Sequence, residues 1–125
     1  MKRLVFRSWL LLLYTEYLMK FRGFMELHRV VGMEPISRRG SSQPIPSEDL
    51  CHAIDLASVF YFKPVLCLQR SAAATILLRR HGWAAEMVIG AQIVPFKSHA
   101  WCELNGIVLN DKPYMRDVYQ VFDHC

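Results

Sequence analysis

The sequence predicts a single α+β domain, in which helices come first and an antiparallel β-sheet comes last. The chain has 125 residues, of which 53% are hydrophobic and 21% charged, so it carries enough apolar surface for one packed core. Apolar residues recur at helical spacing as far as residue 80. Beyond it, alternating apolar runs flank Asn105-Gly106, a pair of residues typical of a β-hairpin turn.

Residues 5–31 are predicted to form an amphipathic helix. Polar residues recur every seven positions on one side, at Ser8, Thr15, Arg22 and Arg29. The opposite side is apolar and rich in aromatic residues, with Leu10, Leu13, Tyr14, Tyr17, Leu18, Phe21, Phe24 and Met25. We expect Gly23 to divide the helix, and Gly32 with Pro35 to end it. The wide apolar side of residues 9–31 is expected either to pack beneath the domain or to leave a docking surface for a partner.

A polar linker at residues 37–46 leads into two further helices. Ser47 is the expected N-cap of a helix that runs to about residue 62, since Pro64 prevents its continuation. An Ala- and Leu-rich segment at residues 67–80 predicts the third helix, and Gly82 lies just beyond its end.

Strands are predicted at residues 84–94, 99–104 and 107–110. The Asn105-Gly106 turn joins the last two, because both turn positions of such a hairpin require positive φ. Since the two strands run antiparallel, His99 at the start of one is expected beside Asp111, just past the end of the other. The sequence leaves residues 113–125 open between a short helix and an extended segment.

The excess positive charge lies near the start of the chain. With 15 Lys and Arg against 11 Asp and Glu, the formal net charge is +4 and the pI about 9.0. Eight basic and three acidic residues give residues 1–40 a charge of +5, which leaves −1 for residues 41–125. No basic stripe interleaved with aromatic residues marks a nucleic-acid site. An acidic protein or peptide is therefore the better expected partner, with a solvated helix face as the alternative.

The apolar run at residues 9–14 is too short to cross a membrane, which requires about 20 such residues. Glu16 and Lys20 interrupt its continuation, and no small-residue cleavage site follows it. We therefore expect a cytoplasmic protein without membrane insertion. In that reducing compartment, cysteines without paired spacing are expected to be buried, metal-bound or catalytic, and the chain has four: Cys51, Cys67, Cys102 and Cys125.

Cys67, His99 and Asp111 are predicted to act as nucleophile, base and orienting group. A helix N-terminus and a neighbouring imidazolium both stabilise a thiolate, and Cys67 opens a predicted helix. Asp111 is expected to fix the tautomer of His99, and the backbone N–H of Cys67 to serve as an oxyanion donor. Cys51 lies inside a helix and Cys102 alternates away from the face of His99, so neither suits the role. The alternative is that Cys67 is a buried structural cysteine and His99 a structural histidine.

Several short motifs occur in an order that resembles a known family. They are CLQRS at 67–71, RRHG at 79–82, VIG at 88–90, SHAW at 98–101 and NG…LND at 105–111. Through them, residues 50–111 resemble the transglutaminase-like leader peptidases of lasso-peptide biosynthesis, within the transglutaminase-like and papain-like cysteine protease superfamily. The resemblance implies N-terminal helices packed against a small antiparallel sheet, with the catalytic cysteine at a helix N-terminus.

The family's catalytic residues fall on Cys67, His99 and Asp111. The resemblance implies the stand-alone protease half of a split B protein, which removes the leader from a precursor peptide. It implies a separate leader-recognition protein and an ATP-dependent cyclase as partners, and chemistry that requires no metal or cofactor. Residues 1–125 are then one protease domain, made of a helical segment with linker at 1–46 and a catalytic core at 47–125. The usual Ala and Val are replaced by Ser98 and Cys102, which bears on fine specificity.

Other interpretations remain open. His99-x-x-Cys102, with Cys67 and Asp111 near, suggests a metal module, although strand alternation puts the first two side chains on opposite faces. The same triad also serves an acyl or amide transferase, and a non-catalytic binding protein can keep the fold. Trp101, on the same face as His99, is expected either to bind substrate in the wall of the site or to belong to the core.

Overall fold

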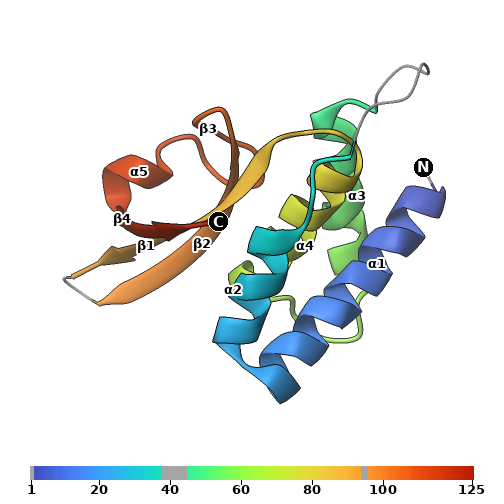
Figure 1. Ribbon diagram of the computed structural model, residues 1–125, viewed down its shortest axis with the longest axis horizontal. Helices are drawn as coiled ribbons and strands as arrows, with labels where there is room; N and C mark the ends of the chain where they lie inside the picture. Colours follow the sequence, from blue (N-terminus) through green and yellow to red (C-terminus); the bar gives the residue numbers. More distant parts are fainter. Residues whose placement is uncertain (1, 38–44, 94–95) are drawn as a thin grey trace.

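The computed structural model describes residues 2–37, 45–93 and 96–125, and shows a group of helices on one side of an antiparallel sheet (Figure 1). The helices before the sheet are α1 (Lys2–Tyr17), the π-helix η1 (Leu18–Arg22), α2 (Phe24–Met33), α3 (Ser47–Val59) and α4 (Cys67–Arg80). The sheet contains β1 (Ala85–Gln92), β2 (Lys97–Leu104), β3 (Ile107–Val108) and β4 (Gln120–His124), with the short helix α5 (Met115–Val118) before β4. The α+β prediction is confirmed.

The sheet has the strand order β3-β2-β1-β4, and all its neighbours are antiparallel. The predicted hairpin turn is present, with φ of 52° at Asn105 and 82° at Gly106. The segment left open by the sequence forms both a helix, α5, and a strand, β4, which adds to the outer side of β1. The C-terminal segment therefore completes the sheet.

Helix α4 is the centre of the core. It packs against α1 and α3 on one side and against β1 and β2 on the other. Every residue from Ser71 to Arg79 is buried, and the three alanines 72–74 allow neighbouring elements to approach closely. Because Cys67 is the first residue of α4, the helix with the most buried residues holds the predicted nucleophile.

The N-terminal helices form as predicted, but in α1 the side with the regular polar residues is the buried one. Ser8 and Thr15 are fully buried, whereas Leu10 and Tyr14 are 43% and 40% exposed. Each buried hydroxyl donates to a backbone carbonyl of its own helix, at 2.7 Å for Ser8 and 3.0 Å for Thr15. Their burial therefore leaves no polar group unsatisfied, and small side chains let α1 approach α3 and α4 closely. For α1, the interpretation that the apolar side packs beneath the domain is therefore wrong, although Leu18 of that side is buried in η1.

The helix ends differ from the predictions in detail. Gly23 has φ of 86° and separates η1 from α2, as expected. The N-cap of α3 is Pro46 instead of Ser47, and α3 ends at Val59 instead of residue 62. Most of the predicted linker, residues 38–44, lies outside the described residues. In the described ranges, no helix is both long and apolar enough to span a membrane.

Candidate active site

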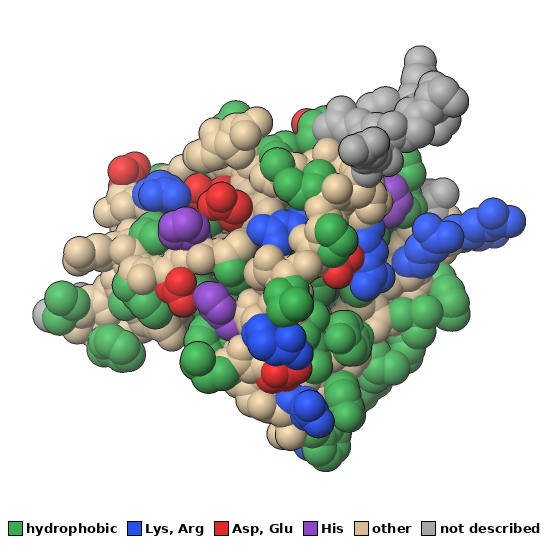
Figure 2. Space-filling model, in the orientation of Figure 1, with side chains coloured by type: hydrophobic (Ala, Val, Ile, Leu, Met, Phe, Trp, Pro, Cys, Tyr) green, Lys and Arg blue, Asp and Glu red, His purple; other side chains and the backbone are tan. Residues whose placement is uncertain are grey.

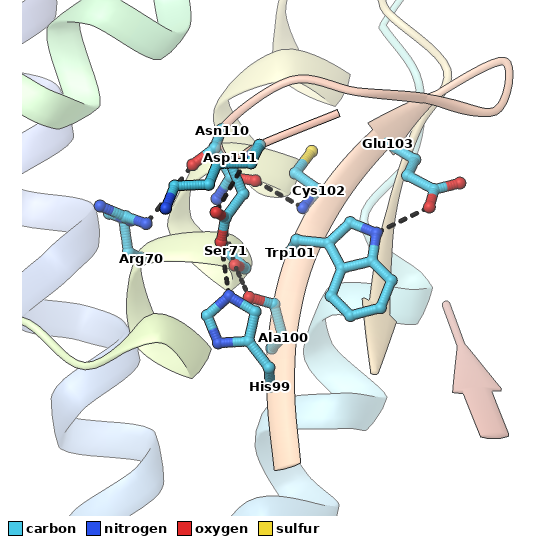
Figure 3. A network of polar contacts seen from close by, with 10 residues as sticks. Arg70, Ser71, His99, Ala100, Trp101, Cys102, Glu103, Asn110 and Asp111 are labelled. Atoms are coloured by element: carbon cyan, nitrogen blue, oxygen red, sulfur yellow. Dashed lines mark hydrogen bonds and ion pairs between the residues drawn. The ribbon is translucent and has the colours of Figure 1, made fainter. Parts of the chain in front are cut away.

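His99 and Asp111 form a hydrogen-bonded pair beside β2 (Figure 3). His99 lies near the start of β2, and Asp111 lies in the segment after β3. Because the hairpin turn makes β3 antiparallel to β2, this segment returns toward the start of β2. The His99 Nε2 to Asp111 Oδ2 distance is 2.5 Å. Because a carboxylate only accepts hydrogen bonds, Nε2–H is the donor, and Nδ1 is left to face another group.

The surroundings of Asp111 favour its charged form. Burial acts to raise the pKa of this carboxyl group, but the hydrogen bond from His99 and the backbone N–H of Lys112, at 2.8 Å from Oδ1, lower it and prevail. The pKa of Asp111 is therefore below its ordinary value. Near neutral pH, Asp111 is a carboxylate that holds the imidazole in one tautomer and one orientation.

Cys67 is the first residue of α4, where backbone N–H groups point out of the helix. The residue before it, Leu66, is extended, with φ of −76° and ψ of 155°, and its carbonyl accepts the first N–H of the helix ladder from Arg70 at 3.0 Å. The N–H groups of the first turn thus have no carbonyl acceptor within the helix. Cys67 is partly exposed.

Cys67 and His99 line the same cavity, which has a volume of about 260 Å³. Its remaining walls are largely apolar and come from α2, α4 and the sheet: Phe24, Leu68, Ile89, Ser98, Ala100 and Phe122. The structure therefore places two of the predicted site residues on one cavity and joins the second to the third by a hydrogen bond. This cavity is small and apolar, so it suits an uncharged side chain next to the thiol.

Ser71 and Asn110 tie the three parts of the site together (Figure 3). Ser71, one turn after Cys67, donates to the carbonyl of Ala100 at 3.0 Å. The Asn110 amide donates to Ser71 Oγ at 3.1 Å, and its oxygen accepts the backbone N–H of Cys102 at 2.7 Å. Helix α4, strand β2 and the segment carrying Asp111 are thereby fixed relative to one another. Sequence reasoning assigned Asn110 no separate role, although it directly precedes Asp111 in the LND motif.

Two aromatic rings lie against the imidazole of His99. The Tyr119 ring is stacked on it, with centroids 5.3 Å apart and planes at 24°, and Trp101 is stacked at 6.1 Å and 28°. Trp101 is fully buried, and its Nε1 donates to Glu103 Oε2 at 2.7 Å. The structure therefore places the Trp101 ring in the core, the second of the two interpretations, and leaves no part of it accessible. No pattern in the sequence indicated Tyr119.

The other three cysteines lie in different surroundings. Burial raises the pKa of the Cys51 thiol to about 11 and that of Cys125 to about 11. Burial also raises the pKa of Cys102 to about 12, and its Sγ accepts a hydrogen bond from Thr75 at 3.4 Å. Within the described part of the chain, no group of three or more His, Cys, Asp or Glu side chains is arranged to hold a metal ion.

Comparison with known proteins places this chain in a family. The model of the transglutaminase-like superfamily matches residues 9–123. The chain belongs to this superfamily. The microcin J25-processing protein McjB of Escherichia coli is 44% identical over 55 residues, which are 44% of this chain and 26% of McjB. The match thus spans about a quarter of that relative's length. No solved structure matches the chain. Membership of the transglutaminase-like superfamily accounts for a fold in which a helix N-terminus meets a small antiparallel sheet.

Proposed function

We propose that this chain is a cysteine peptidase that removes the leader from a lasso-peptide precursor, with Cys67, His99 and Asp111 as its catalytic residues. The observation that carries the proposal is the 2.5 Å hydrogen bond between His99 and Asp111, combined with the cavity that His99 shares with Cys67. Membership of the transglutaminase-like superfamily supports the thiol chemistry. The similarity to McjB, a protein that processes microcin J25, supports a precursor peptide as substrate.

In the proposed reaction, the Cys67 thiol transfers its proton to Nδ1 of His99 and the thiolate attacks the carbonyl carbon of the last leader residue. Backbone N–H groups at the start of α4 stabilise the negative charge on the carbonyl oxygen. The imidazolium then protonates the departing amine, which leaves as the new amino terminus of the core peptide. His99 next removes a proton from water, which hydrolyses the thioester and frees the leader as a carboxylic acid. Asp111 keeps His99 in the tautomer and orientation that each step requires.

The proposed partners follow from this reaction. A leader-recognition protein presents the precursor, and an ATP-dependent cyclase consumes the new amino terminus. The proposed location is the cytoplasm. The largely apolar wall of the 260 Å³ cavity, including Leu68 and Phe122, favours an uncharged, apolar substrate side chain beside the scissile bond.

The test is cleavage of a lasso precursor in the presence of its leader-recognition protein, followed by mass spectrometry. We expect Cys67→Ala to abolish cleavage, and Cys51→Ala and Cys102→Ala to retain it in the fraction that folds. Cleavage that persists in folded Cys67→Ala refutes the proposal. The mass of the leader product separates two reactions on the same triad: a free acid indicates hydrolysis, and an amide indicates transfer to an amine.

A further inference from the structure

The outer face of α1 and η1 is apolar along its middle. The hydrophobic residues exposed on these two elements are Phe6, Leu10, Leu13, Tyr14, Tyr17 and Phe21. Figure 2 shows hydrophobic side chains gathered along this helix at the lower right edge of the molecule. A row of exposed large side chains on one helix face is typical of a surface that another element covers. We call these six residues the α1 face.

The shape of the α1 face fits a second helix. Leu10, Tyr14, Tyr17 and Phe21 are spaced by four, three and four residues, the spacing at which helices pack along one another. Leu10 and Tyr14 also lie between two grooves. One groove, of about 490 Å³, runs beside Phe62, and the other, of about 550 Å³, runs beside Leu77. Helices pack with the side-chain ridges of one in the grooves of the other, so a ridge flanked by two grooves can accommodate the side chains of a second helix.

The exposed charges of α1 and η1 have a single sign. The remaining exposed residues of α1 and η1 are all basic: Lys2, Arg3 and Arg7 at one end, and Lys20 and Arg22 at the other. The one acidic residue of these two elements, Glu16, is ion-paired with Lys63 and accepts a hydrogen bond from Tyr61. Its charge is therefore already balanced. A second copy of this chain would bring like charges together, whereas carboxylates on a partner would meet cations at both ends.

We propose that the α1 face is the docking site for an amphipathic helix of a partner protein, one that carries an apolar stripe and acidic residues at both ends of that stripe. The apolar stripe fills the two grooves, and the acidic residues pair with the basic residues of α1 and η1. This inference does not depend on the proposed peptidase reaction, because the surface lies on helices outside the cavity that holds Cys67 and His99.

The test uses the whole chain as bait for a displayed library of helical peptides with randomised surface positions. We expect the enriched helices to carry an apolar stripe with Asp and Glu near its ends. Leu10→Glu with Tyr14→Glu should weaken their binding at least tenfold, and so should Arg7→Glu with Lys20→Glu, which changes charge alone. Val59→Glu, at an exposed apolar position of α3, is the matched control and should bind normally. Circular dichroism checks that each variant is folded.

Three outcomes overturn the inference. One is that no helix is enriched, or that the enriched helices show no acidic bias. Another is that binding survives both double substitutions in folded protein. The third is that a different occupant uses the same residues. In that case the acidic helices do not bind, and the wild-type protein instead binds phosphatidylglycerol vesicles or dimerises. The double substitution Leu10→Glu with Tyr14→Glu then abolishes vesicle binding or dimerisation.

Discussion

Gly90 lies directly opposite His99 in the pairing of β1 with β2, and it has no room for a side chain. A Cβ atom at position 90 would lie 2.8 Å from the indole of Trp101 and 2.9 Å from Cβ of Tyr119. The register between β1 and β4 also shifts at this point, between Ile89 and Gly90. The bare backbone at position 90 therefore allows the two aromatic rings to close against the imidazole.

Gly90→Ala should lower both stability and leader cleavage. The added methyl group must displace Trp101 or the backbone around Tyr119, and such overpacking costs about 1–3 kcal/mol. The free energy of unfolding in urea and the rate of leader cleavage measure the two effects. Gly32→Ala is the matched control, because its Cβ would lie 3.6 Å from Cys125, an ordinary contact, and alanine suits a helix. A Gly90→Ala protein with wild-type stability and rate would contradict the crowding described above.

Tyr119 should position His99 through its ring and not through its hydroxyl. We expect Tyr119→Phe to cleave at close to the wild-type rate, and Tyr119→Leu to lose about five- to tenfold in kcat with KM little changed. A stacked pair contributes about 1 kcal/mol, and each 1.36 kcal/mol is tenfold in rate. The measurement is kcat and KM for the precursor with its recognition protein. Equal losses of kcat in Tyr119→Phe and Tyr119→Leu would show that stacking of the Tyr119 ring does not position His99.

The position of Asp111 could be predicted from the sequence because it depends on local rules. Asn105 and Gly106 both adopt positive φ, which fixes the hairpin register, and that register carries Asp111 back to His99. The start of α4 at Cys67 was predictable for a similar reason, since a run of Ala and Leu begins there and Gly82 follows its end.

The orientation of α1 and the role of Tyr119 depend on long-range packing. A helical period shows that two faces differ, but it does not show which face other helices cover. Ser8 and Thr15 are buried because small residues allow close approach and because their hydroxyls bond within the helix. Tyr119 reaches His99 only because β4 pairs with β1, and the five residues of β4 carry no strong strand pattern.

Asn110→Ala should loosen the segment that holds Asp111. The substitution leaves the backbone N–H of Cys102 without its side-chain acceptor, and an unsatisfied buried group costs about 1–3 kcal/mol. We expect lower stability in urea and slower cleavage, with the KM for precursor less affected than kcat. Asn105→Gly is the control, because glycine tolerates positive φ and the hairpin should persist. A normal kcat in Asn110→Ala would show that Asp111 is positioned without this network.

Cys67 should be the first thiol to react with iodoacetamide near neutral pH. Burial raises the pKa of Cys51, Cys102 and Cys125 to about 11, 12 and 11, so they remain protonated at neutral pH, whereas the thiolate is the reactive form. Peptide mapping by mass spectrometry at short times measures which site is labelled. His99→Ala, which removes the proposed base, should slow labelling of Cys67. Faster labelling of any other cysteine in folded protein would argue against Cys67 as the nucleophile.

Glu103 should make stability depend on acid pH. Burial acts to raise its pKa, but hydrogen bonds from Arg116, at 2.9 Å to each oxygen, and from Trp101 prevail and bring the pKa below its ordinary value of 4.5. A group whose pKa is depressed by folding contributes stability above its unfolded pKa, and that contribution is lost as the pH falls through the folded value. Stability should therefore decline below about pH 4.5, with Asp111 adding to the decline because its shift has the same sign.

Glu103→Gln isolates this contribution. The amide keeps the shape of the side chain but cannot form the ion pair with Arg116, so we expect a loss of about 1–3 kcal/mol at pH 7. The difference between the variant and the wild type should shrink as the pH falls below about 4.5, and it should vanish once the pH is below the depressed pKa of folded Glu103, where that side chain is neutral as well. Urea unfolding at several pH values measures both effects, with Glu86→Gln as the control because the Glu86 side chain is exposed and lies 3.6 Å from Nδ1 of His124, which is itself exposed. A constant difference between Glu103→Gln and wild type at all pH values would show that the charge of Glu103 does not stabilise the fold.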